Sequence, residues 1–217
     1  MALTLTKLCL PSFVLVGIIL SSAILPTTSF DVGSVVTSDF FDGIKNKAAP
    51  DCVGQSFYTR DEFLNAVTQF NDFAQAGSDD DSKRMCKIEE DDKSNSYCDD
   101  INYPAYPCVS GKLYYGRGPL QLTWNYNYGE CGKVVGFDGL QAPETVSQDP
   151  SVSFKCSLWF WMTNVHSVVN QGFGETIRKI NSGECDGGNP AQVQSRVGYY
   201  QDYCSKFGVD SGQNLYC

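Results

Sequence analysis

The sequence YYGRGPLQLTWNYNYG, residues 114–129, is the stretch from which the fold and function of this chain are best interpreted. It combines flat aromatic rings with neutral side chains that both donate and accept hydrogen bonds. Such groups suit sugar hydroxyl and N-acetyl groups, and aromatic faces suit the apolar face of a pyranose ring. By composition alone, the stretch fits a sugar-binding site and an aromatic, turn-rich part of the core equally well.

The same region predicts short extended segments. Residues 112–116 and 120–124 could be strands separated by a turn at Gly116, Gly118 and Pro119. The polar residues then alternate with other residues, which would place their side chains on one side of an extended segment. These alternating residues are Gln121, Thr123, Asn125 and Asn127.

Helix signals dominate the rest of the chain. Thr59 begins a capping box, whereas Asp149 and Asn189 each precede a proline at the first helical position. The helix after Asp149 carries apolar residues on more than one face, so we expect it to be buried. A shorter helix is expected at residues 175–180. The sequence therefore predicts a mainly helical domain with long polar loops.

Bulk composition excludes some classes of partner. The chain has 217 residues, a formal net charge of -9 and a sequence pI of about 4.5. Nucleic acids and anionic lipid surfaces select for clustered Lys and Arg, so neither is expected as the main partner. The length is sufficient for one domain with a substantial core.

The first 29 residues have the features of a secretory signal peptide. Lys7 supplies the positive charge, and residues 10–25 form an apolar segment that is short for a bilayer span. A retained signal anchor is the alternative. With cleavage near residue 29, residues 30–217 would form a secreted domain, extracellular or vacuolar, with no membrane attachment.

Cysteine content also indicates an oxidising compartment. Ten cysteines occur, and Cys9 would leave with the signal peptide, so an odd number remains. Spacing alone does not fix their pairing. Zinc is a poor interpretation because no CxxC pair exists and His166 is the only histidine, so no metal site is expected. Cys204 lies on the apolar stripe of the last helix and is predicted to be a buried free thiol.

Four segments carry a close resemblance to a known family. Residues 114–129, 149–162, 172–181 and 193–217 closely resemble plant chitinases of glycoside hydrolase family 19, of the short class IV type. The resemblance runs from about residue 31 to residue 217. It implies a mainly helical, lysozyme-like, two-lobed domain with disulfides, acting as a monomer on chitin or N-acetylglucosamine oligomers without a cofactor. The Cys-rich chitin-binding module and linker of many class IV members are not recognisable here.

The family chemistry needs two carboxyl groups. It inverts the β-1,4 bond, with a general acid and a general base roughly 6.5–9.5 Å apart. Glu90 stands four residues after Cys86, as the family's base does. The acid lies in a His-Glu-Thr motif at the end of a buried helix, and no such motif occurs in this sequence. After Arg84 the sequence passes directly to Met85 and Cys86, which indicates an internal deletion near residues 84–86.

No other carboxylate is a good substitute for the acid. A general acid needs a raised pKa, from burial or from a nearby like charge. Glu89 would share the surroundings of Glu90, and residues 79–81 are expected to be solvated. We therefore expect chitinase activity to be lost or strongly impaired. The alternatives are a non-catalytic chitin- or cell-wall-binding protein, or a defective splice or gene-model product.

The resemblance also implies further residues. The implied disulfides are Cys52–Cys86, Cys98–Cys108 and Cys185–Cys217; Cys131 and Cys156 stay unassigned, although a pair between them would give four bridges. Arg196 could instead be an ordinary charge on a helix surface. The implied substrate-binding residues and their supporting charges are Tyr106, Gln121, Thr123, Asn127, Asn181, Glu184 and Arg196.

Overall fold

Residues 31–47, 51–70 and 88–217 are described by the computed structural model of this chain. These residues are mainly helical, as predicted, and contain no strand. The α-helices are α1 (Val32–Val35), α2 (Ser38–Lys45), α3 (Gly54–Phe57), α4 (Arg60–Val67), α6 (Asn125–Val135), α7 (Thr145–Gln148), α8 (Pro150–Phe160), α9 (Phe173–Ile180) and α10 (Pro190–Phe207). A π-helix, η1 (Trp161–Val165), and two 3₁₀ helices, η2 (His166–Gln171) and η3 (Ser182–Glu184), complete them.

The predicted helix starts are confirmed by side-chain caps. Thr59 accepts a hydrogen bond from the backbone of Glu62, Asp149 caps α8, and Asn189 caps α10. Each cap satisfies a backbone N–H group that has no partner within its helix. The expected helix at 175–180 begins at Phe173, so it is two residues longer than predicted.

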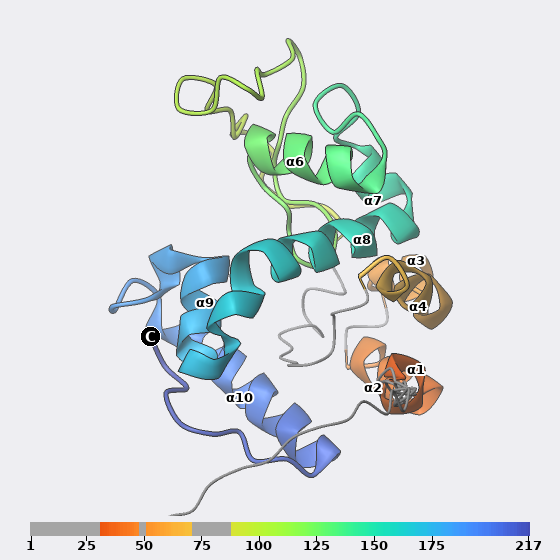
Figure 1. Cartoon of the computed structure of the whole chain (residues 1–217), viewed down its shortest axis with the longest axis vertical. Coiled ribbons are helices and arrows are strands. Elements are labelled where there is room, and N and C mark those ends of the chain that lie inside the picture. Colours follow the sequence, from red (N-terminus) through yellow and green to blue (C-terminus); the bar gives the residue numbers. More distant parts are fainter. Residues whose placement is uncertain (1–30, 48–50, 71–87) are drawn as a thin grey trace, which may run out of the picture.

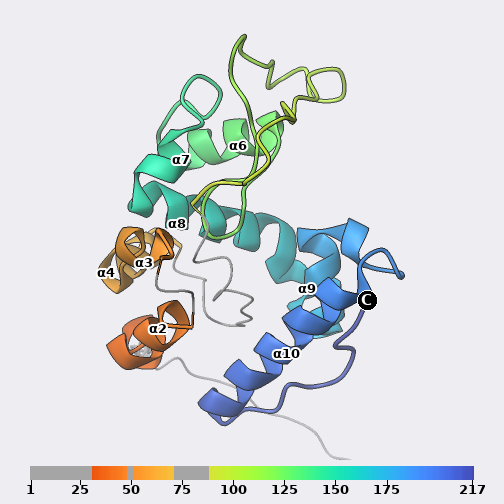
Figure 2. The ribbon, with the colours of Figure 1, turned by 180° about the vertical axis from the view of Figure 1, so that it is seen from behind.

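Helix α8 crosses the middle of the molecule and separates two lobes (Figure 1). One lobe contains α6, α7 and the loops of residues 91–113. The other contains α9 and α10 at one end of α8 and the N-terminal helices α1–α4 at the opposite end. Figure 2 shows the same division from behind. This arrangement matches the predicted two-lobed architecture.

The position of α8 explains its apolar sequence. Phe154 and Leu158 belong to a core shared with α2, α4 and α10. Cys156 and Trp159 belong to a second core shared with α6 and with the 114–128 stretch. Because opposite faces of one helix enter two cores, apolar residues occur around most of its circumference. The prediction of a buried helix is thus confirmed.

Disulfides link these elements. Cys98–Cys108 and Cys185–Cys217 form as predicted. A third bridge, Cys131–Cys156, joins α6 to α8 and settles the pairing that the sequence left open. Cys52 is also disulfide-bonded, but its expected partner Cys86 lies outside the described residues. Cys204 is a buried free thiol, as predicted.

The two expected strands at 112–116 and 120–124 are wrong. The described residues there form only isolated bridges, between Arg117 and Leu122 and between Arg117 and Glu89. Gln121 and Trp124 have φ of 54° and 79°, which no β-strand tolerates. The chain therefore turns sharply and enters α6. Asn125 is fully buried there, so the expected alternation of polar residues along one extended face is also wrong.

Candidate active site

Glu90 is held against the glycine-rich turn of residues 116–118. Its backbone N–H donates to the carbonyl oxygen of Gly116 at 2.7 Å, and the N–H of Gly118 donates to Ile88 at 2.9 Å. The carboxylate accepts hydrogen bonds from the N–H of Gly116 at 2.9 Å and from the hydroxyl of Tyr97 at 3.0 Å. Each oxygen of the Glu90 carboxylate therefore has one hydrogen-bond donor.

Glu89 does not share these surroundings, contrary to expectation. Its carboxylate accepts a hydrogen bond from Ser147 at 2.7 Å and lies 3.3 Å from Arg117 Nε, and it also pairs with Lys93. Burial alone would raise the pKa of this carboxyl group. The hydrogen bonds and positive charges outweigh burial and hold the pKa of Glu89 below its ordinary value. Adjacent residues in an extended backbone point in opposite directions, which explains the difference.

Arg117 is a central residue of this lobe that the sequence interpretation missed. Its side chain is only 4% exposed and lies 3.8 Å from the ring centre of Tyr115. It donates hydrogen bonds to the carbonyl of Leu113 and the hydroxyl of Tyr128. The available signal was a single charged residue between two glycines in an otherwise aromatic stretch. An arginine in such a stretch can be buried only where several hydrogen-bond acceptors surround it. Arg117 therefore fixes the turn against which Glu90 is held.

Three predicted sugar contacts lie beside this turn. Gln121, Thr123 and Asn127 are each half-buried, and each donates a hydrogen bond to a nearby backbone carbonyl. A Cβ atom on Gly116 would lie 2.9 Å from Oε1 of Gln121, so that side chain covers the glycine beside Glu90. The structure thus brings Gln121 and Glu90 together at one glycine.

Tyr106, the predicted aromatic residue of the cleft, packs on α6. A Cβ atom on Gly129 would lie 2.3 Å from its ring, so the ring rests directly on the helix backbone. The hydroxyl group is hydrogen-bonded to Glu130 and to Lys133, whose ammonium group also lies 4.1 Å from the ring centre. Tyr106 is half-buried and anchored at this position.

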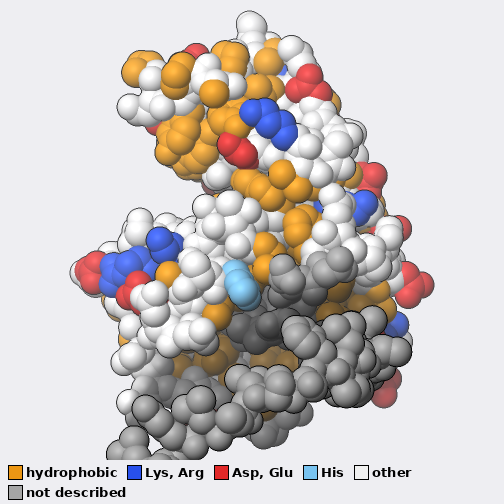
Figure 3. All heavy atoms as spheres, in the orientation of Figure 1, with side chains coloured by type: hydrophobic (Ala, Val, Ile, Leu, Met, Phe, Trp, Pro, Cys, Tyr) orange, Lys and Arg blue, Asp and Glu red, His pale blue; other side chains and the backbone are white. Residues whose placement is uncertain are grey.

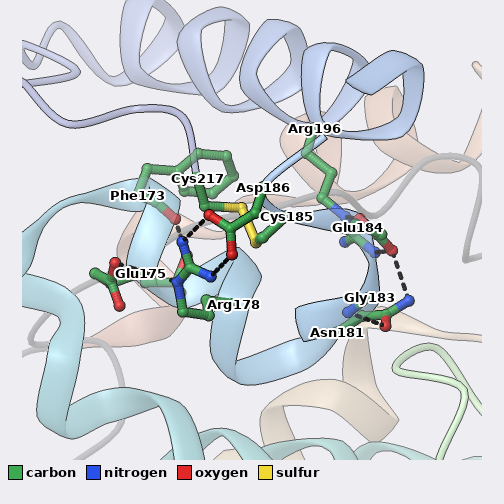
Figure 4. The surroundings of a disulfide bond; sticks show 11 residues. Phe173, Glu175, Arg178, Asn181, Gly183, Glu184, Cys185, Asp186, Arg196 and Cys217 are labelled. Atoms are coloured by element: carbon green, nitrogen blue, oxygen red, sulfur yellow. Dashed lines mark hydrogen bonds and ion pairs between the residues drawn. A yellow bond between two sulfur atoms is a disulfide. The ribbon is translucent and has the colours of Figure 1, made fainter. Parts of the chain in front are cut away.

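The second group of predicted residues lies in the other lobe (Figure 4). Arg196 of α10 donates two hydrogen bonds to Glu184, at 2.6 and 2.8 Å, and Asn181 donates a third at 2.9 Å. Arg196 is 2% exposed and Glu184 is 7% exposed. The alternative of an ordinary surface charge for Arg196 is therefore wrong. The adjoining Cys185–Cys217 bridge fixes this segment.

A hollow separates the two groups. In Figure 3 the surface is indented between the lobe that carries α6 and the lobe that carries α9. Glu90 and Gln121 belong to the first lobe, whereas Asn181, Glu184 and Arg196 belong to the second. The predicted site residues therefore come from both lobes.

Comparison with known proteins identifies the family. The model of glycoside hydrolase family 19, described as chitinase class I, matches residues 82–171 and 165–217. Chitinase 4 of Oryza sativa subsp. japonica is 54% identical over 203 residues, covering 86% of this chain and 71% of the relative. The chain belongs to glycoside hydrolase family 19.

Solved structures of family 19 support the fold. The class IV chitinase from Zea mays is 50% identical, with a TM-score of 0.78 over 85% of this chain and 98% of that chain. Chitinase C from Streptomyces griseus is 36% identical, with a TM-score of 0.70 over 85% of this chain and 81% of that one. The mainly helical, two-lobed architecture is thus that of family 19.

Among the described residues, one group of side chains has a spacing that could bind a metal ion. It is formed by Cys98, Asp100 and Cys108. The two cysteines form a disulfide with each other, so neither can supply a thiolate. The described residues also contain no helix long and apolar enough to cross a membrane.

Proposed function

We propose that this chain is a secreted chitinase-family protein that binds chitin or N-acetylglucosamine oligomers but hydrolyses them weakly or not at all. One observation carries the proposal. Glu90, at the position of the family's base, is held by two donors, whereas the sequence contains no His-Glu-Thr motif to supply the acid. Without a general acid, the leaving oxygen departs unprotonated, which typically costs a factor of about 10² to 10⁴ in rate.

The lost segment would lie between Arg84 and Cys86, outside the described residues. The alignment with the rice relative runs over 203 positions but covers 86% of 217 residues, about 187, so about 16 positions have no counterpart here. The family match also begins at residue 82, next to this junction. Both findings support a deletion of the length of a short helix with its motif.

Neighbouring carboxylates are unsuited to replace the acid. Glu89 has a lowered pKa, so it is ionised at neutral pH and cannot donate a proton. Asp91 and Asp92 are exposed, and hydrogen bonds from Ser94 hold the pKa of Asp92 below its ordinary value. The acidic stretch therefore supplies a base position and solvated charge.

Substrate binding is assigned to the walls of the hollow. In this proposal Gln121, Thr123 and Asn127 contact the sugar, and Tyr106 supports them through α6. We assign Asn181 to the orientation of a water molecule, and the pair Glu184–Arg196 holds that asparagine through its hydrogen bond to Glu184. Neutral amide and hydroxyl groups on one wall match the neutral, N-acetylated ligand.

Secretion is part of the same proposal. Residues 1–29 would be the signal peptide and residues 30–217 the chitinase-like domain. The disulfides formed by seven of the described cysteines favour an oxidising compartment, which secreted and vacuolar proteins encounter during their maturation. The domain is proposed to act as a monomer.

A carbohydrate-binding protein with no turnover at all is the second candidate, as opposed to an enzyme with weak residual turnover. It is favoured by the intact contacts of Gln121 and Arg196 in a chain that lacks the acid motif. Glu90→Gln, with Glu175→Gln as a control for loss of one charge, separates the two candidates. A weak enzyme loses its residual turnover with Glu90→Gln but not with Glu175→Gln. A purely binding protein shows no turnover in any variant and keeps its affinity for chitin oligomers with both.

Thermal unfolding tests whether the chain is a defective product. A ligand that binds the native state raises its unfolding temperature, and the rise grows with the logarithm of the ligand concentration relative to Kd. A cooperative transition that rises with added chitin hexamer supports a folded binding protein. The absence of a cooperative transition, or of any response to the hexamer, would overturn the proposed function.

A further inference from the structure

A row of aromatic rings leads away from Glu90. Tyr97, whose hydroxyl contacts Glu90, meets Trp124 edge-to-face, with ring centres 5.4 Å apart. The Trp124 ring is nearly parallel to Tyr126, at 6.2 Å and 16°. Tyr126 in turn stacks on Tyr103, at 3.8 Å and 19°. The row therefore connects the proposed base to Tyr103, a residue that no site described above includes.

Two members of this row have strained backbones. Tyr97 and Trp124 have φ of 50° and 79°, in the region that non-glycine residues rarely adopt. Their N–H groups are held by the Asn95 side chain and by the carbonyl of Tyr114. Such conformations persist only where the surroundings impose them, and they cluster at ligand-binding sites.

The loop at the far end, residues 98–108, is rigidly anchored. A disulfide joins its two ends. The fully buried Asn125 accepts a hydrogen bond from the N–H of Asp99 at 2.9 Å and donates one to the carbonyl of Tyr106 at 2.7 Å. Ligand binding to a fixed loop avoids most of the entropy cost of ordering it.

This loop presents apolar side chains to solvent. Ile101 is 89% exposed and Tyr103 is 41% exposed. Figure 3 shows apolar side chains gathered at the same end of the molecule, over the loops beside α6. Contiguous exposed apolar surface is typical of protein, membrane or ligand interaction sites.

Charge restricts the ligand of this loop. Residues 98–108 contain two aspartates, Asp99 and Asp100, and no lysine or arginine. Anionic polysaccharides, nucleic acids and anionic lipids are therefore disfavoured. A neutral pyranose with an apolar face fits an exposed tyrosine ring at the end of an aromatic row.

We propose that Tyr103, with Ile101 beside it, forms an outer sugar-binding subsite for a neutral N-acetylated glycan chain. This inference rests on the proposed binding of chitin in the hollow. A long oligomer bound at Glu90 extends along the aromatic row, and its distal ring stacks on the exposed face of Tyr103. A short oligomer occupies the inner contacts only.

Calorimetric titration with the chitin trimer and hexamer tests this subsite. The variant is Tyr103→Ala, and Tyr216→Ala is the matched control because Tyr216 is an exposed tyrosine of the other lobe, at 56%. We expect Tyr103→Ala to weaken hexamer binding about 3- to 10-fold, the range of one aromatic contact, and to leave trimer binding unchanged. Tyr103→Trp should retain hexamer affinity.

The outcomes separate this inference from the proposed function. If the unchanged protein binds neither oligomer, both are overturned. If it binds the hexamer and Tyr103→Ala binds it equally well or more tightly, only the outer subsite is overturned; tighter binding would mean that Tyr103 covers Tyr126 rather than receives sugar. The competing explanation is that a second copy of the chain covers this surface, and sedimentation of the unchanged protein tests it. A dimer that is dissociated by Ile101→Ser would assign the surface to a second copy and overturn the outer subsite.

Discussion

Arg196 and Glu184 form a buried, two-bonded ion pair that joins α10 to η3. The guanidinium donates through Nε and a terminal nitrogen to both carboxylate oxygens, at 2.6 and 2.8 Å. A second such pair lies close by on the surface, where Arg178 contacts Asp186 at 2.6 and 3.1 Å (Figure 4). Both pairs have two hydrogen bonds, but Arg178 donates through its two terminal nitrogens, and the pairs differ in burial.

Removing Arg196 should therefore be far more damaging than removing Arg178. Arg196→Ala leaves the Glu184 carboxylate buried without its counterion, which typically costs about 3–5 kcal/mol. Arg178→Ala breaks an exposed, solvent-screened pair and should change the stability little. Urea denaturation of both variants measures the difference. Equal losses of stability would contradict the buried placement of Glu184.

The Glu89 carboxylate should contribute a pH-dependent part of the stability. Its pKa in the folded chain lies below the ordinary value of 4.5, so the unfolded chain binds the proton more tightly. The contribution is complete above that ordinary value and is lost as the pH falls through the lower, folded pKa. The difference in stability between neutral and acid pH should therefore be larger in the unchanged protein than in Glu89→Gln.

Urea midpoints at pH 7 and at pH 3 check this dependence. Asp202→Asn serves as the control, because Asp202 also has a lowered pKa but lies on the exposed surface beside Lys47 and Lys206. Glu89→Gln should flatten the pH profile relative to the unchanged protein. A parallel profile for Glu89→Gln and the unchanged protein would mean that the contacts of Glu89 with Arg117 and Ser147 are absent in solution.

Thiol titration should detect one cysteine in the processed chain. Cys204 is buried and free, whereas Cys52 and three complete bridges account for seven of the other cysteines that the structure describes. A thiol reagent should find no reactive group in the native protein and one group after denaturation without reductant. Cys204→Ser should remove that group. Three thiols after denaturation would mean that Cys52 and Cys86 are not paired.

Local sequence signals were sufficient for the starts of α4, α8 and α10, whereas α1, α2, α3, α6 and α7 were not predicted. A cap such as Asp149 and the proline after it act within one turn, so the start of α8 can be predicted without knowledge of the rest of the fold. The stretch at 112–124 could not be predicted in this way. Its course depends on contacts with distant residues, such as the bond of Trp124 to Tyr114 and the pairing of Gly116 with Glu90.

Burial of polar residues also escaped local interpretation. Arg117 and Asn125 look like solvent-exposed residues in an aromatic loop, but both are buried because their partners come from other segments. Asn125 holds both ends of the 98–108 loop, and Arg117 meets Glu89. The resemblance to family 19 supplied the pairing of Glu184 with Arg196, which spacing alone would not have predicted.

The rate of reducing-end release from the chitin hexamer tests the central claim most directly. It should be measured beside the maize class IV chitinase, with substrate saturating for both proteins. The loss of the general acid predicts a rate at least about 100-fold below that of the maize enzyme. A rate within about tenfold of the maize enzyme, abolished by Glu90→Gln, would contradict the claim that the acid has been lost.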